Sequence, residues 1–422
     1  MPTTDVSPTV TQVCRQARQA ASVTRELRTS AKDHALALVA DALNSGRNRL
    51  QAANSLDIDQ AASDGVSATT IDRLRLTESR ITSMVNSIRT VIELPDPVGQ
   101  IVTGIVRPNG LLIERVREPL GVVAVVYEAR PNVTADVAAL CLKSGNAAVL
   151  RGSSVAAHTN ATIADLIAEA LAEQDEVPVH AVQLIRDLSR EAVVELLTAS
   201  EWVDLLVPRG GPGLLATVRE HATVPVVIDG DGNCHVYVDA SADPAIATSI
   251  VVNAKTSRPS VCNAAETLLV HSAIAESWLP EVLGELGKRG VVLRADQRAR
   301  VIWPDAEAAQ ESDWATEYLD LILAVRVVDS LDEALAHISR WGTRNSEAIV
   351  ARDIDVARRF ARAVDSGSVF VNTSTRFSDG GEFGYGLEIG VSTQKLHARG
   401  PMGLEALTCV KNVTWGDGQI RE

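Results

Sequence analysis

One cysteine in the sequence has neighbours that suit covalent chemistry. Cys262 lies in the turn-like segment 253–267 and follows Lys255 and Arg258 closely. Nearby cations favour the thiolate form of a cysteine, and the thiolate is the form that attacks an acyl carbon. The segment therefore predicts a nucleophile at Cys262. The alternative is a small buried apolar residue, which is the commoner fate of a lone cysteine.

A second segment, 127–134, places an amide where an oxyanion would need a donor. Asn132 comes after an expected apolar strand and opens a helix. An asparagine amide in such a place can donate to the oxygen of a tetrahedral intermediate. An ordinary turn or helix cap is the alternative interpretation, because asparagine is favoured there in any case.

Two further loops follow expected strands and suit an anionic ligand. The loop 207–213 joins a strand to a helix and can expose backbone N–H groups to an anion, although it is neither a GxGxxG nor a Walker loop. The loop 150–154 carries an arginine and two serines but no acid, a composition that admits the 2′-phosphate of NADP. For both loops the alternative is an ordinary solvated turn. The candidate residues are Arg151, Ser153, Ser154, Arg209, Gly210 and Gly211.

The hydrophobic pattern predicts the elements that position these residues. Residues 11–94 have helical spacing, and the β-prone runs 101–106 and 111–116, joined by Pro-Asn-Gly, predict a hairpin. From Gly121 short apolar strands alternate with helices, which predicts a parallel sheet covered on both faces that binds ligands at the carboxyl ends of its strands. The expected strands are 122–127, 147–150, 182–185, 203–207 and 224–228.

The rest of the chain continues as mixed α/β up to about residue 371. The segment 372–401 is rich in glycine and polar residues, but its interspersed apolar residues indicate function rather than disorder. We expect a strand at 404–413. At 422 residues the chain is long enough for two or three domains.

Composition excludes several classes of function. Forty Lys and Arg against 54 Asp and Glu give a formal net charge of −14. This charge excludes nonspecific binding to nucleic acid as the main activity, and it argues against docking to an anionic membrane. A local basic cluster can still bind a small anion. No apolar run is long enough to span a membrane and no secretory signal is visible. The five cysteines lack CxxC spacing and the histidines lack HxxxH spacing, so we expect no metal site and a reducing, cytoplasmic location.

Taken together, five segments closely resemble the γ-glutamyl phosphate reductases, the glutamate-5-semialdehyde dehydrogenases within the aldehyde dehydrogenase superfamily. The segments are 127–134, 143–152, 207–211, 258–263 and 392–403. The resemblance implies an α/β, aldehyde dehydrogenase-like fold with three parts: a parallel-sheet NADPH-binding domain, an α/β catalytic domain and a β-ribbon oligomerisation element. The expected boundaries are 1–97 and 119–252 for the first, 253–400 for the second, and 98–118 and 401–422 for the ribbon.

The resemblance also implies an activity. It is the NADPH-dependent reduction of L-glutamyl 5-phosphate to L-glutamate 5-semialdehyde and phosphate through a cysteine thioester, the second step of proline biosynthesis from glutamate. The family nucleophile falls on Cys262, the oxyanion-stabilising asparagine on Asn132, and the glutamate that holds the nicotinamide ribose on Glu317. The basic residues that could hold the phosphate and carboxylate of the substrate are Arg130, Lys255, Arg258 and Arg376.

The sequence departs from the family pattern at two places. Asn345 stands where the family usually has a histidine. The superfamily glutamate that activates water has no clear counterpart in 229–232, which suits a reductase because water should be kept out.

Two other readings stay open. A CoA-acylating or oxidising aldehyde dehydrogenase of the same architecture would differ in its phosphate dependence. A dinucleotide-binding scaffold would lack activity, which the intact segment around Cys262 argues against. The family also makes a homo-oligomer, and association with the upstream glutamate 5-kinase, reasonable expectations.

Overall fold

The computed structural model describes residues 8–228 and 230–421, and these divide into two compact units. The first unit comprises the chain up to Ile228, together with Gly384–Gly390 and the residues from Met402 onward. The second comprises the chain from residue 229 to Phe383, together with Val391–Pro401. The N-terminal segment in which we see no secretory signal falls largely on residues 1–7, outside the described residues. Among the described residues, no helix is long and apolar enough to cross a membrane.

Helices open the first unit, as the spacing of residues 11–94 predicts. The first, α1, begins with a capping box in which the side chains of Thr9 and Gln12 each accept from the other's backbone N–H. The apolar stripes of these helices are buried, which accounts for their formation from sequences of ordinary helix propensity. The helices are α1 (Val10–Thr24), α2 (Thr29–Ser45), α3 (Arg47–Ser63), α4 (Ala68–Leu74) and α5 (Glu78–Glu93).

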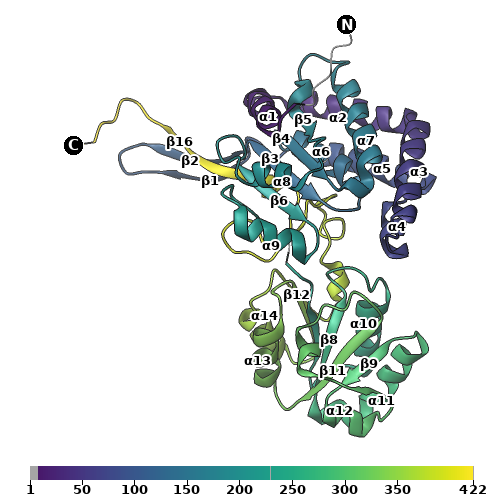
Figure 1. Cartoon of the computed structure of the whole chain (residues 1–422). Coiled ribbons are helices and arrows are strands. Elements are labelled where there is room, and N and C mark those ends of the chain that lie inside the picture. The colour runs from purple at the N-terminus through teal and green to yellow at the C-terminus, as the bar shows by residue number, and fades with distance from the viewer. Residues whose placement is uncertain (1–7, 229, 422) are drawn as a thin grey trace. The chain divides into compact units, whose positions relative to one another are not determined.

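A parallel sheet of four strands follows, in the order β5-β4-β3-β6 (Figure 1). Its strands are β3 (Val122–Tyr127), β4 (Ala147–Gly152), β5 (Val182–Leu184) and β6 (Leu205–Arg209). Its helices are α6 (Asn132–Lys143), α7 (Ala157–Leu171), α8 (Arg190–Leu197) and α9 (Pro212–His221), with short 3₁₀ turns at Ser154–Ala156 and Val179–Ala181.

The strand order places a reversal of direction in the middle of this sheet. From β3 the chain steps outward to β4 and β5, and then returns to the other side of β3 with β6. Ligands of such sheets bind at that reversal, outside the carboxyl ends of the two strands. The prediction of a fifth strand at 224–228 is wrong, since only a single bridge between Leu206 and Val226 forms there.

The predicted hairpin and C-terminal strand form one antiparallel ribbon in the order β1-β2-β16. Its strands are β1 (Ile101–Val106), β2 (Leu112–Pro119) and β16 (Thr408–Trp415), the last preceded by the 3₁₀ turn Leu404–Leu407. Figure 1 shows the ribbon extending away from the helices and sheet of its unit. Every residue of β1 is exposed.

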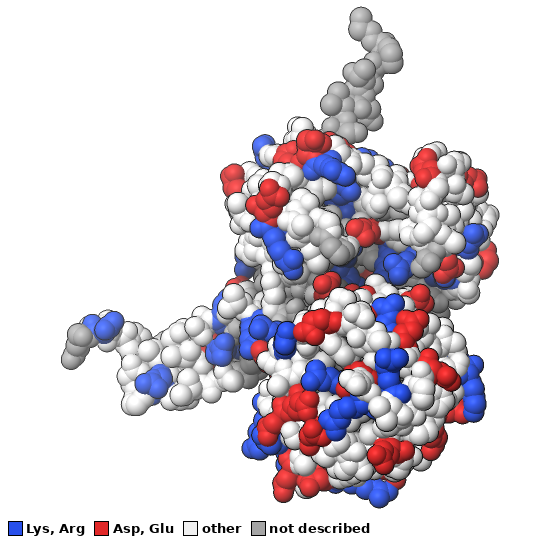
Figure 2. All heavy atoms as spheres, turned by 60° about the horizontal axis from the view of Figure 1, so that its bottom comes forward, with Lys and Arg blue, Asp and Glu red and all other residues white. Residues whose placement is uncertain are grey.

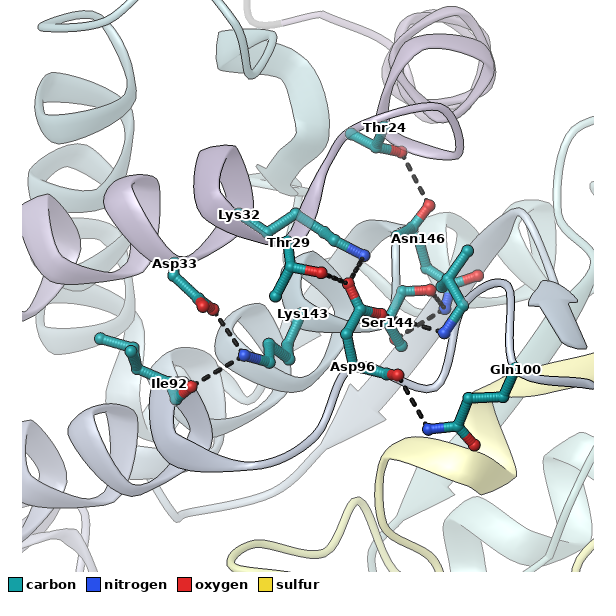
Figure 3. Close-up of polar contacts among 12 residues, drawn as sticks. Thr24, Thr29, Lys32, Asp33, Ile92, Asp96, Gln100, Lys143, Ser144 and Asn146 are labelled. Carbon is teal, nitrogen blue, oxygen red and sulfur yellow. Dashed lines mark hydrogen bonds and ion pairs between the residues drawn. The ribbon is translucent and has the colours of Figure 1, made fainter.

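Buried polar contacts fasten the base of this ribbon to the first sheet (Figure 3). Next to them, the fully buried Lys143 joins α6 to α2, with its Nζ 2.5 Å from a carboxylate oxygen of Asp33. Asn146 accepts from the backbone N–H of Gly121 at 2.7 Å and donates to the carbonyl of Leu407 at 2.9 Å. Gly121 directly precedes β3 and Leu407 directly precedes β16, so Asn146 joins two elements far apart in the sequence.

The second unit is built on a seven-stranded sheet in the order β10-β9-β11-β8-β7-β12-β13, with every pair parallel. The strands are β7 (Cys234–Val238), β8 (Ala265–His271), β9 (Val292–Ala295), β10 (Glu307–Ala308), β11 (Ile322–Val328), β12 (Ser346–Val350) and β13 (Ser368–Val371). The helices are α10 (Pro244–Thr256), α11 (Ser272–Lys288), α12 (Gln297–Ile302), α13 (Leu331–Trp341) and α14 (Ile354–Ala363). Short pieces complete it: 3₁₀ turns Glu311–Ala315 and Thr375–Phe377, and an antiparallel pair of β14 (Val391–Ser392) and β15 (Gly400–Pro401).

Helices cover both faces of this second sheet. Along β7, Val236 and Val238 pack in one apolar cluster with α10, α11 and α12, whereas Tyr237 packs in another with α13 and α14. This compact unit begins near residue 229, because β7 pairs with β8 and β12 and α10 packs on the same sheet. The division of the chain into cofactor, catalytic and oligomerisation parts stays a prediction.

Candidate active site

Cys262 lies in the loop that joins α10 to β8, where it is half-buried. The thiol of Cys234 donates a hydrogen bond to the carbonyl oxygen of Cys262, with 3.1 Å between Sγ and O. Burial raises the pKa of Cys234 well above its usual range, so this thiol stays protonated and remains a donor. Sequence reasoning gave Cys234 no role, because nothing in its local sequence indicates that it contacts a loop 28 residues further on.

Glu317 belongs to the same neighbourhood through the chain just before β7. The backbone N–H of Gly232 donates to Oε1 of Glu317 at 2.8 Å. Gly232 also lies against the backbone of Cys262. Gly232 therefore contacts both Glu317, the predicted ribose ligand, and the backbone of Cys262, the predicted nucleophile. Asp229, at the start of the segment where we see no water-activating glutamate, lies outside the described residues.

One of the predicted substrate arginines, Arg376, interacts electrostatically both with Cys262 and with a second predicted arginine, Arg258. Burial, and after it the charge of Arg258, lowers the pKa of the Arg376 guanidinium, and the charges of Asp379 and Cys262 oppose that shift. The guanidinium is held in place by Asn263, whose Oδ1 accepts from Nη1, and by the Oγ of Ser257, which lies 3.0 Å from Nε. Two cations beside a cysteine favour an anion there, whether it is the thiolate or a bound phosphate.

Hydrogen bonds to neighbouring loop residues hold Asn263 in place. Because Asn263 in turn accepts from Arg376, the local fold determines where the Arg376 guanidinium lies. Its Nδ2 donates to the carbonyl of Ser378 at 3.0 Å, and its own carbonyl accepts from the Thr375 hydroxyl at 2.7 Å. The residue after the predicted nucleophile therefore couples the loop of Cys262 to the 3₁₀ turn that carries Arg376. The sequence offered Asn263 only as part of a recognisable segment.

The structure places the third basic residue of this segment, Lys255, in the core. Lys255 is fully buried at the end of α10, and its Nζ lies 2.6 Å from Oε2 of Glu266. Burial raises the pKa of Glu266 to about 7 and lowers the pKa of Lys255. The other carboxylate oxygen accepts from the backbone N–H of Leu319 at 3.2 Å. Lys255 thus has a protein partner, and its role as a substrate ligand stays a prediction without structural support.

In the first unit, Asn132 is the first residue of α6 and is exposed. Its side-chain Nδ2 donates to Oδ2 of Asp136 at 2.8 Å. Burial raises the pKa of Asp136 to about 6, against the opposing effects of this hydrogen bond and of Arg209. The sequence analysis missed Asp136, although a spacing of four residues on an expected helix is the signal that could have found it. The predicted substrate ligand Arg130 lies two residues before Asn132 and is exposed.

The predicted anion-binding loops lie at the carboxyl ends of β4 and β6. Arg151 is largely buried, and its guanidinium donates to the carbonyls of Gly152 at 3.0 Å and Leu188 at 2.6 Å, so it braces its own loop. The Ser153 side chain accepts from the backbone N–H of Val155. These contacts leave the exposed residue Ser154 and the loop backbone to face a ligand.

The loop after β6 lies at the reversal of the first sheet and leads into α9. Gly211 is the N-cap of α9, and no side chain caps that helix. A Cβ at Gly213 would have open space around it, whereas one at Gly210 would lie 2.7 Å from the Glu128 carboxylate. An uncapped helix start with open space in front of it suits a phosphate group. Arg209 is the last residue of β6 and directly precedes this loop.

The remaining predictions concern absences. No group of His, Cys, Asp and Glu side chains in the described residues could hold a metal ion. Asn345, at the position of the family histidine, is buried just before β12, and its Oδ1 accepts from the Ser346 hydroxyl at 2.9 Å.

Comparison with known proteins gives one consistent result. A family model described as the aldehyde dehydrogenase family matches residues 3–300. The γ-glutamyl phosphate reductase of Thermobifida fusca is 53% identical over 418 residues, which cover 99% of this chain and 100% of the relative. That of Moorella thermoacetica is 54% identical over 408 residues, covering 97% of each chain.

Solved structures give the same picture. The crystal structure of γ-glutamyl phosphate reductase from Thermotoga maritima is similar with a TM-score of 0.96 and 45% identity, covering 98% of this chain and 100% of that one. An acetylating aldehyde dehydrogenase from Geobacillus thermoglucosidasius, with a TM-score of 0.69 and 20% identity over 98% of this chain and 97% of its own, shares the fold alone.

Proposed function

This chain belongs to the aldehyde dehydrogenase family and, within it, to the γ-glutamyl phosphate reductases, and from that membership we propose that it reduces L-glutamyl 5-phosphate to L-glutamate 5-semialdehyde and phosphate. This reaction is the second step of proline biosynthesis from glutamate. The observation that carries the proposal is the half-buried Cys262 with the oriented guanidinium of Arg376 near it, which in turn interacts with Arg258. A nucleophile in a segment with two arginines suits a substrate that carries both a phosphate and a carboxylate.

In the proposed first step the Cys262 thiolate attacks the acyl carbon of the substrate. A bond forms between the acyl carbon and Sγ of Cys262. The bond between the acyl carbon and the bridging oxygen of the phosphate breaks, and phosphate leaves with that electron pair. Phosphate is a stable anion and needs little protonation to leave, so the arginines need only hold its charge. Arg376 is better suited than Arg258 to a fixed contact, because Asn263 and Ser257 already orient its guanidinium.

The oxyanion formed during this attack needs donors. We propose the backbone N–H of Cys262 as one donor. The family's oxyanion-stabilising asparagine falls on Asn132, whose side-chain amide is the second donor that the family pattern implies. Loss of one such donor typically costs about 3 kcal/mol, or roughly 100-fold in rate.

The first unit has the features that a nicotinamide dinucleotide needs. The uncapped start of α9 at the reversal of the sheet suits a pyrophosphate. The assignment of Glu317 as the ribose ligand rests on the family pattern alone. The acid-free loop that holds Ser153 and Ser154 favours the 2′-phosphate of NADPH over the bare ribose of NADH. When bound, NADPH would supply the hydride that reduces the thioester.

The ribbon supports a homo-oligomer. Its edge strand β1 exposes Ile101, Val102, Ile105 and Val106. Figure 2 shows the ribbon as mostly uncharged, whereas acidic and basic side chains are interspersed over the rest of that face. The backbone groups on the free side of an edge strand can pair with another strand, and exposed apolar side chains are stabilised by burial. A second copy of the chain can supply both contacts. Association with glutamate 5-kinase stays a prediction.

One assay separates this function from that of a related aldehyde dehydrogenase. With glutamate 5-semialdehyde and NADP⁺, the purified chain should reduce NADP⁺ only when inorganic phosphate is present, and Cys262→Ala should abolish the reaction while NADP⁺ still binds. Turnover without phosphate, or turnover driven by CoA, would assign the chain to an oxidising or CoA-acylating enzyme. Binding of NADP⁺ with no turnover under any of these conditions would indicate a scaffold.

A further inference from the structure

The start of α6 holds a side-chain pair of which the proposed mechanism uses one member, Asn132, and leaves the other, Asp136, without a role. Asn132 and Asp136 are four residues apart, so they lie one above the other on the same face of the helix. The amide Nδ2 of Asn132 donates to Oδ2 of Asp136 at 2.8 Å. Asn132 is exposed and Asp136 is half-buried, so the carboxylate is the more fixed member of the pair.

We propose that Asp136 is a positioning residue that fixes the orientation of the Asn132 amide for oxyanion stabilisation. The inference rests on the proposed function, because it assumes that Asn132 serves the oxyanion. It gives Asp136 no contact with substrate or cofactor.

The chemistry of the two groups supplies the reason. An ionised carboxylate only accepts hydrogen bonds, so Asp136 accepts one N–H of the Asn132 amide and specifies which end of the amide is nitrogen. The second N–H is then left as a donor to an oxyanion. Without this partner the amide can rotate by half a turn and present Oδ1, which would repel the oxyanion instead of stabilising it.

The charge that faces Asp136 from the neighbouring strand supports its ionised state. Arg209 ends β6 and favours the carboxylate, while burial disfavours it, and the pKa of Asp136 is raised to about 6. Asp136 is therefore ionised at neutral pH and becomes protonated under mildly acidic conditions. A protonated Asp136 can donate a hydrogen bond, so it no longer imposes one orientation on the amide.

A double-mutant cycle tests whether Asp136 acts through Asn132. The variants are Asp136→Ala, Asn132→Ala and the double variant, with kcat and KM measured separately. We expect Asn132→Ala to lower kcat about 100-fold and Asp136→Ala about 10-fold, with KM nearly unchanged. The double variant should be no slower than Asn132→Ala alone, and Asp136→Glu should recover most of kcat. Losses that multiply in the double variant, or a wild-type kcat in Asp136→Ala, would overturn the proposal.

A pH profile provides a second, independent readout and does not depend on how Asp136→Ala folds. The isosteric variant Asp136→Asn keeps the volume and removes the titration, so an acid limb of kcat near pH 6 in the wild type should be absent from it. The same acid limb in Asp136→Asn would overturn the proposal. If Asn132→Ala keeps the wild-type kcat, the oxyanion role fails as well, whereas the reaction itself is judged separately by its phosphate dependence and by Cys262→Ala.

Discussion

Gly232 lies directly against Cys262: a Cβ at Gly232 would come within 1.8 Å of the Cys262 carbonyl oxygen. The obstacle is backbone, which cannot swing aside as a long side chain can. The N–H of Gly232 is at the same time hydrogen-bonded to Glu317. The position of the nucleophile thus depends on a residue 30 positions earlier having no side chain.

We predict that Gly232→Ala will inactivate the enzyme without unfolding it. The added methyl group must displace the loop of Cys262, and a misplacement of about 1 Å in reacting groups can cost roughly 100-fold in rate. The measurements are kcat and the rate at which iodoacetamide alkylates Cys262. Gly284→Ala in α11 is the control, because its Cβ would be in ordinary contact with Trp303. Equal activity of the two variants would refute the role of Gly232.

Arg376 should govern substrate binding rather than protein stability. Its guanidinium is oriented by Asn263 and Ser257, so Arg376→Lys keeps the charge but loses the fork. We expect KM for the acyl phosphate to rise about tenfold in Arg376→Lys and further in Arg376→Ala, since a charged hydrogen bond is worth about 1.5–3 kcal/mol. The exposed Arg359, which pairs with Asp332, provides the control Arg359→Ala. A KM unchanged in both Arg376 variants would exclude this arginine from the substrate site.

The cysteines should differ sharply in reactivity. Burial raises the pKa of Cys14 and of Cys141 to about 12, and Cys234 is fully buried as well. Cys262 should therefore react first with iodoacetamide at pH 7.5, and the exposed Cys409, whose pKa is raised, should follow more slowly. Peptide mapping by mass spectrometry gives the order, and Cys409→Ser isolates the reaction of Cys262. Labelling of Cys141 or Cys234 in the native protein before Cys262 would contradict this order.

The Lys255–Glu266 pair should behave as a structural ion pair. Lys255→Met leaves a buried carboxyl without its partner, which typically costs about 3–5 kcal/mol at a pH where the group is charged. The pKa of Glu266, about 7 with its partner present, then rises further. A buried carboxyl with a raised pKa destabilises the fold as pH rises through that pKa, so the loss of thermal stability should be larger at pH 8 than at pH 5.5.

The double variant Lys255→Met/Glu266→Leu separates this role from substrate binding. Removing both charges should restore much of the stability, and KM should stay within about threefold of the wild type because no substrate contact is lost. A large rise in KM despite restored stability would show that Lys255 binds substrate and is not only part of a structural ion pair.

Patterns local in the sequence predicted much of this structure, and they were weakest where a side chain's direction matters. The apolar runs of β3 and β4, the helices of residues 11–94 and the antiparallel ribbon follow from periodicity and turn residues. Lys255 and Arg258 looked equivalent because both closely precede Cys262. The former, however, ends α10 facing the core, where its partner Glu266 lies in a strand that begins after the loop. Spacing along the chain does not show on which side of a loop a charge will lie.

The sheet to which a strand belongs was also beyond local patterns. The sequence of the short apolar run Val236–Val238 fits a strand at the end of the first sheet as well as one within the second. Only its pairing with β8 and β12 shows that it belongs to the second sheet. In the same way the contacts of Gly232 and Cys234 with Cys262 join segments 28 to 30 residues apart. The contact of Asp136 with Asn132 could have been predicted from the sequence, since the two residues lie one helical turn apart.

The central claim is that Cys262 carries the acyl group as a thioester that phosphate resolves. The most direct measurement is to mix the enzyme with glutamate 5-semialdehyde and NADP⁺ in the absence of phosphate, and to follow NADPH and the intact protein mass together. We predict a burst of about one NADPH per chain with a matching acyl adduct on Cys262, followed by a halt that added phosphate relieves. Continuous turnover without phosphate, or an adduct on any other residue, would contradict the account.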